Sequence, residues 1–114
     1  MPDILIANDD KSSREIFKAL LSTEFSDSFI GLVKNGREAQ KILANIDFDA
    51  VICDVQMPYM TGFEVYDSLS DPPPFVMTSC STNYKSEAEK RNICFLSVPC
   101  TRKELCDKVR ECMG

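Results

Sequence analysis

The residues best suited to chemistry in this chain are carboxylates that stand directly after apolar runs. Asp54 follows the apolar run 50–53, and a second apolar run, 4–7, is followed by Asn8, Asp9 and Asp10. Short continuous apolar runs are typical of strands buried on both faces of a parallel sheet. Parallel strands bring their carboxyl ends to one edge, where open α/β sheets bind their ligands. The pattern therefore predicts an acidic site at one sheet edge.

Carboxylates that gather in one place repel each other unless a cation lies among them. Hard oxygen ligands suit Mg²⁺, which takes one or two carboxylates and keeps several waters. A simpler interpretation also stands for each group: Asp54 as a loop residue, and Asn8 to Asp10 as the N-cap of a following helix. A cap needs only one such residue, so three in a row leave acceptors for a site.

The rest of the chain alternates between the two kinds of element. Apolar runs predict strands at 3–8, 29–33, 49–54, 75–78 and 93–98. Helical patterns lie between them, at 10–23, 37–45, 62–69, 81–91 and from 101 onward. Five strands alternating with five helices predict an α/β fold, a parallel sheet with helices on both faces.

Two of these helices carry capping-box patterns at their start, Ser12 with Glu15 and Thr101 with Glu104. The apolar stripe expected on the first helix is Ile16, Phe17, Leu20 and Leu21. The segment 81–91 is mostly polar, so its helix is expected to have only a thin apolar face.

The composition is that of a single globular domain. The chain has 114 residues, of which 44% are hydrophobic and 27% charged, and its net charge is -5. An acidic chain without a basic stripe argues against a nucleic-acid partner. No run approaches the roughly 18 apolar residues of a membrane span, and no signal peptide is evident. We therefore expect a cytoplasmic protein without membrane insertion.

The six cysteines do not form a metal-binding pattern. There is no C-x-x-C pair and no histidine, so a zinc site is not expected. In a cytosolic protein the thiols are expected to be reduced and to fill the core. Cys106 and Cys112 are six residues apart, about 600° around a helix, so we expect them on different faces.

Taken in order, these features resemble the receiver domain of bacterial two-component response regulators. The matching pieces are Asn8-Asp9 after the first strand, Asp54 after the third, Met57-Pro58 and Gly62 beyond it, Thr78 ending the fourth strand, and Pro99 after the fifth. The resemblance covers nearly the whole chain. It implies a flavodoxin-like doubly wound sheet with strand order 2-1-3-4-5 and one receiver domain over 1–114 without an output domain.

The resemblance also implies the chemistry of the site. Asp54 would be the phosphoacceptor, taking a phosphoryl group from a histidine kinase or phosphotransfer protein. Asp9, Asp54 and the backbone carbonyl of Gln56 would bind Mg²⁺, and Asn8 would act through a metal-bound water. Thr78 would then hydrogen-bond the phosphoryl group.

Strand five carries both a further switch residue and the main departure from the family. Phe95 occupies the place of the switch aromatic, which would rotate inward. The family places a lysine before Pro99, and this chain has Val98, which carries neither charge nor donor. Lys103, on the next helix, is not expected to replace it. The Val98–Pro99 bond is a candidate cis peptide.

Two functions follow, and two others are disfavoured. The first is a stand-alone, non-enzymatic receiver that signals to an unknown downstream protein, and the alternative is a pseudo-receiver that binds partners without phosphorylation. An aspartyl phosphatase would need an acid two residues after Asp54, where this chain has Gln56. A flavin carrier would need a phosphate-binding loop after strand one, which is missing here.

Overall fold

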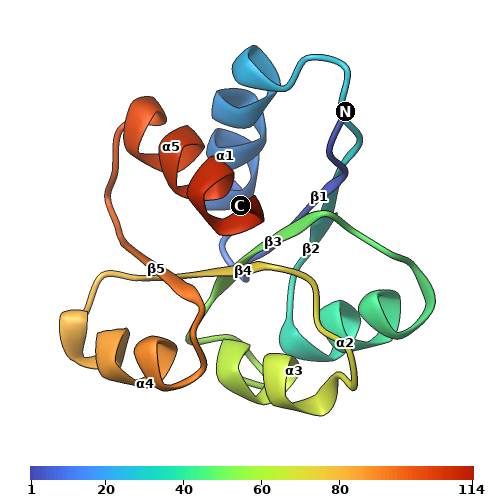
Figure 1. Ribbon diagram of the computed structural model, residues 1–114, viewed down its shortest axis with the longest axis vertical. Helices are drawn as coiled ribbons and strands as arrows, with labels where there is room; N and C mark the ends of the chain where they lie inside the picture. Colours follow the sequence, from blue (N-terminus) through green and yellow to red (C-terminus); the bar gives the residue numbers. More distant parts are fainter.

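The computed structural model describes all 114 residues. Its strands form one parallel sheet. Its strands are β1 (Ile4–Ala7), β2 (Ile30–Val33), β3 (Ala50–Asp54), β4 (Phe75–Ser79) and β5 (Cys94–Ser97). They lie in the order β2-β1-β3-β4-β5 (Figure 1), which confirms the predicted flavodoxin-like topology. Because β1 and β3 are neighbours, the residues that follow them meet at the centre of one edge.

Helices cover both faces of this sheet. They are α1 (Lys11–Glu24), α2 (Gly36–Asn45), α3 (Gly62–Ser68), α4 (Lys85–Lys90) and α5 (Arg102–Met113). Helices α1 and α5 lie on one face, and α2, α3 and α4 lie on the other (Figure 1). None of the helices is long and apolar enough to cross a membrane.

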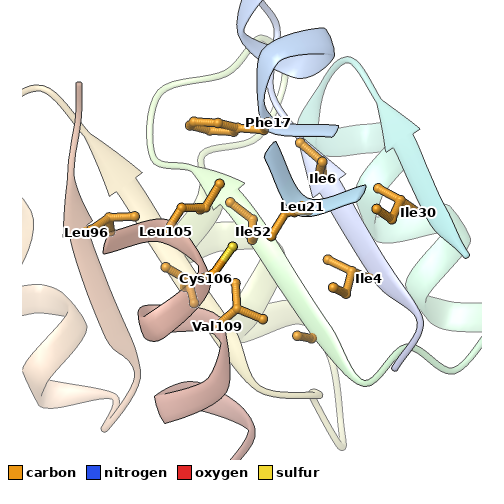
Figure 2. Close-up of a cluster of buried hydrophobic side chains, with 12 residues drawn as sticks. Ile4, Ile6, Phe17, Leu21, Ile30, Ile52, Leu96, Leu105, Cys106 and Val109 are labelled. Atoms are coloured by element: carbon orange, nitrogen blue, oxygen red, sulfur yellow. The ribbon is translucent and has the colours of Figure 1, made fainter. Parts of the chain in front are cut away.

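The sheet separates two apolar clusters of twelve buried residues each. Figure 2 shows the first, where Phe17 and Leu21 of α1 and Leu105 of α5 meet Ile52 of β3. On the opposite face, β3 contributes Val51 to the second cluster. Side chains alternate across a strand, so β3 serves both clusters and is buried from Ala50 to Cys53, as its apolar run predicts.

The helix starts differ from the predicted caps at one place. The Thr101–Glu104 capping box is present at α5, as expected. The predicted box at Ser12 is wrong, because Asp10 caps α1 by accepting hydrogen bonds from both the amide and the hydroxyl of Ser13. Asp10 stands two residues before Ser12, so Ser12 lies inside the first turn, and the N-cap predicted within Asn8 to Asp10 is confirmed.

The fourth helix is much shorter than the predicted 81–91. A 3₁₀ turn, η1 (Thr82–Tyr84), precedes the six residues of α4, and Ala88 is the only buried residue in that helix. An apolar face this thin cannot hold a long helix against the sheet, which explains the difference. The end of the segment is instead fixed by Arg91, which pairs with Asp67 of α3 and Glu87 of α4.

The cysteines confirm the core-filling prediction only in part. All six are free, but Cys53 and Cys106 alone are buried, and Cys80 is exposed. Cys106 and Cys112 both pack against the same cluster, contrary to expectation. Helix α5 has the sheet on one side and α1 beside it, so two of its faces are covered (Figure 1).

Candidate functional site

The predicted acidic residues do come together, at the carboxyl edge of the central strands. Asp54 ends β3 half-buried, and Asn8 and Asp9 follow β1, the adjacent strand. All three line a cavity of about 600 Å³. Thr78 lies opposite Asp54 in the register of β3 and β4, and it lines the same cavity.

The loop after β1 divides its three polar residues between two tasks. Asn8 is buried, and its side-chain oxygen accepts a hydrogen bond from the amide of Asp10 at 2.8 Å. Arg14 donates to the backbone carbonyl of Asn8, also at 2.8 Å. The Asp10 carboxylate accepts hydrogen bonds from the hydroxyl and the amide of Ser13, and these two bonds lower the pKa of Asp10. Asp10 therefore caps the helix, and Asp9 is left exposed toward the cavity.

The electrostatics of Asp54 indicate a place for a cation. Burial of its carboxyl, together with the negative charge of Asp9, raises the pKa of Asp54 to about 6. The backbone N–H groups of Val55 and Gln56 oppose this shift, because they stabilise the carboxylate. A cation between Asp9 and Asp54 would stabilise the ionised carboxylate and so offset the effects of burial and of Asp9 on this pKa.

The donor set here fits Mg²⁺ better than a softer metal. No group of three or more His, Cys, Asp or Glu side chains comes together to ligate an ion. Mg²⁺ does not require such a group, since one or two carboxylates, a carbonyl and waters complete its shell. Asp9, Asp54 and the carbonyl of Gln56 would be the protein ligands, and the cavity leaves room for water.

The hydroxyl side of the cavity holds one residue that sequence reasoning missed. Ser79 is buried beside Thr78, and its hydroxyl accepts a hydrogen bond from the amide of Ser81 at 3.1 Å. The signal was the position of Ser79 directly after Thr78, at the carboxyl end of the strand where the site lies. Both residues line the cavity.

The wall on the β5 side is apolar. Val98 and Pro99, joined by a cis peptide bond, line the cavity together with Cys100. No lysine or arginine is among the lining residues. Lys103 is exposed, and its ammonium is bound to Asp107 at 2.6 Å, so it does not take the place of the missing lysine.

One predicted core position differs from expectation. Ile16 was expected in the core with Phe17, but its side chain is 56% exposed at the cavity lining. The α1 face that meets the core is narrow, and Ile16 lies beyond it. Phe95 lies half-buried on β5 opposite Met77, beside a groove toward α5, and its role as a switch residue stays a prediction.

Comparison with known proteins identifies the family. Residues 4–110 match the response regulator receiver domain. The response regulator MprA of Mycolicibacterium vanbaalenii is 38% identical over 80 residues, which are 67% of this chain and 34% of that protein. A protein-glutamate methylesterase/protein-glutamine glutaminase of Geobacillus kaustophilus is 34% identical over 86 residues, 74% of this chain and 25% of that protein. The chain thus spans about a third or less of these relatives.

A solved structure supports the same assignment. The response regulator TrrA of Thermotoga maritima, solved in complex with Mg²⁺ and BeF, has a TM-score of 0.87 and 26% sequence identity. The match covers 97% of this chain and 98% of that one. Fold, site and family model agree, and the chain belongs to the receiver domains of response regulators. Receiver domains of this family act in two-component signalling, and Mg²⁺ is bound in solved relatives.

Proposed function

We propose that this chain accepts a phosphoryl group on Asp54, with Mg²⁺, from a histidine kinase or phosphotransfer protein. The observation that carries the proposal is the meeting of Asp54, Asp9 and Thr78 around one cavity at the switch point of the sheet. The family membership supports it. The signal would then pass to a downstream protein by contact.

The proposed reaction is a phosphoryl transfer between two side chains. A carboxylate oxygen of Asp54 attacks the phosphorus atom, the phosphorus–nitrogen bond of the donor phosphohistidine breaks, and its electron pair stays on the imidazole. Bound Mg²⁺ would supply the charge that offsets repulsion between Asp54 and the incoming anion. Asp9, Asp54 and the Gln56 carbonyl would hold that ion, Asn8 would act through a water, and Thr78 would donate a hydrogen bond to a phosphoryl oxygen.

One observation favours the second candidate function, a partner-binding module that works without phosphorylation. The cavity has no cationic side chain, because Val98 stands where the family has lysine. Losing one charge-assisted hydrogen bond costs about 1.5–3 kcal/mol, or one to two decades of a rate or equilibrium. Such a loss weakens phosphorylation and weakens any movement of Thr78 and Phe95 that depends on it.

Intact mass after incubation with Mg²⁺ and acetyl phosphate tests the first function against the second. We expect the native chain to gain one phosphoryl group, an Asp54→Ala variant to gain none, and a Val98→Lys variant to react about ten times faster. A native chain that stays unmodified while Val98→Lys is phosphorylated would reject the first function and favour the binding module. Modification of Asp54→Ala would reject Asp54 as the acceptor.

A further inference from the structure

A single side-chain hydrogen bond connects the loop after Asp54 to the start of α4. The amide nitrogen of Gln56 donates to the hydroxyl of Tyr84 at 2.9 Å, across 28 residues of sequence. Tyr84 ends η1 and stands immediately before α4, where no side chain caps the helix. The bond therefore links the site loop to the residue from which α4 begins.

Gln56 belongs to the site by its backbone as well. It stands two residues after Asp54, it lines the same cavity, and its N–H faces the Asp54 carboxylate. Any change of charge or ligation at Asp54 acts on this stretch of backbone. Gln56 therefore contacts Asp54 through its backbone N–H and Tyr84 through its side chain.

Both ends of α4 rest on one aromatic ring of α3. The Tyr84 ring lies 6.3 Å from the Phe63 ring, and the Arg91 guanidinium lies 4.6 Å above the same ring. Arg91 is fixed further by Asp67, at 2.7 Å, and by Glu87, at 3.0 Å. Of the two ends, only the Tyr84 end reaches the cavity loop.

Helix α4 is the shortest α-helix of this fold and has the fewest buried residues. It has six residues, and Ala88 is its only buried side chain, so little apolar burial opposes a shift. Its position depends on the contacts at its ends. The opposite wall of the cavity offers no cation to pass on a signal, because Val98 contributes only an apolar surface there.

We propose that the Gln56–Tyr84 hydrogen bond is the relay by which occupancy of the Asp54 site changes the position of α4. The relay rests on the proposed phosphorylation of Asp54. In it, Tyr84 is a positioning residue that touches neither phosphoryl group nor metal, and Phe63 is the surface on which Tyr84 and Arg91 move.

The link itself is tested first, in the unmodified protein, by hydrogen exchange of the segment 82–93. We expect Tyr84→Phe and Gln56→Ala each to speed exchange there about two- to fivefold, the scale of one neutral hydrogen bond. The double variant should add nothing further. Tyr66→Phe is the matched control, since Tyr66 packs edge-on against Phe75 and should leave the segment unchanged. Additive effects of the two substitutions would reject the link.

The relay is tested next with Mg²⁺ and acetyl phosphate, reading intact mass and exchange on the same samples. We expect the native chain and Tyr84→Phe to gain the same mass, and the exchange change in 82–93 to fall by at least half in Tyr84→Phe. An equal exchange change in the two phosphorylated proteins would overturn the relay and leave the proposed function standing. A native chain without a mass gain would overturn the proposed function and the relay with it.

Discussion

At the scale of single residues, the site places two carboxylates that repel each other, Asp9 and Asp54, side by side. Asp54 is half-buried beside Asp9, and no basic side chain lines their cavity. Burial and the neighbouring carboxylate raise the pKa of Asp54 to about 6. A folded-state pKa above the unfolded value near 3.8 means that the folded protein binds the proton more tightly. The stability that Asp54 contributes is therefore present below about pH 4 and is lost as the pH rises through about 6.

An Asp54→Asn variant should remove this pH dependence. Without Mg²⁺ at pH 7.5, we expect its free energy of unfolding to exceed that of the native chain by on the order of 1 kcal/mol, after allowance for solvent screening of a half-buried group. The advantage should vanish near pH 4 and shrink when Mg²⁺ is added to the native chain. Urea unfolding across pH 4–7.5 measures it. Asp27→Asn, an exposed carboxylate away from the cavity, is the control, and identical pH profiles for native and Asp54→Asn proteins would contradict the assignment.

At the scale of elements, the site depends on how closely α3 approaches the end of β3. Gly62 begins α3, and its amide donates to the carbonyl of Val55 at 2.9 Å. A Cβ at this position would lie 2.7 Å from the Asp54 carbonyl oxygen and 2.9 Å from the Met77 sulfur. The glycine is required by this packing, since its backbone lies outside the left-handed region. The loop of Gln56 is thereby held tightly between β3 and α3.

Gly62→Ala should damage both stability and the site. We expect a loss of about 1–3 kcal/mol in the free energy of unfolding, because the backbone of Asp54 has to move to admit the methyl group. Phosphorylation per folded molecule should fall as well. Gly31→Ala, where the added Cβ would meet only side-chain atoms and none closer than 3.3 Å, is the matched control in urea unfolding and intact mass. A Gly62→Ala protein as stable as this control would show that α3 shifts without cost.

At the scale of the whole molecule, the sheet keeps two apolar clusters apart, and each is sealed by its own helices. Leu105 is fully buried where α5 meets the sheet (Figure 2). Leu105→Ala should cost about 2–5 kcal/mol, a large part of the 5–15 kcal/mol of an ordinary domain. Leu32→Ala on β2, 38% exposed, should cost less than half as much. Denaturant unfolding measures both losses. Equal losses would show that burial of Leu105 beneath α5 stabilises the protein no more than the half-exposed Leu32 does.

Some features of the fold and of the site could be predicted from the sequence, and others could not. The strands and the acidic site at their carboxyl ends were predictable because buried apolar runs and the polar residues after them are local signals. The strand order followed from the resemblance to receiver domains and not from these runs. The exposure of Ile16 was not predictable, because it depends on how α1 is placed against the sheet. The shortness of α4 and the Gln56–Tyr84 bond depend on contacts between distant segments, which no local pattern records.

The exposed thiol of Cys80 has a practical consequence. It lies at the cavity, directly beyond Thr78 and Ser79, and the other five cysteines are buried or partly covered. A gentle alkylating reagent would modify Cys80 first and leave the native core intact. A fluorescent dye attached there would report, in real time, when an anion or a docking helix enters the cavity beside it. The chain thus carries its own attachment point for a sensor, without any engineered mutation.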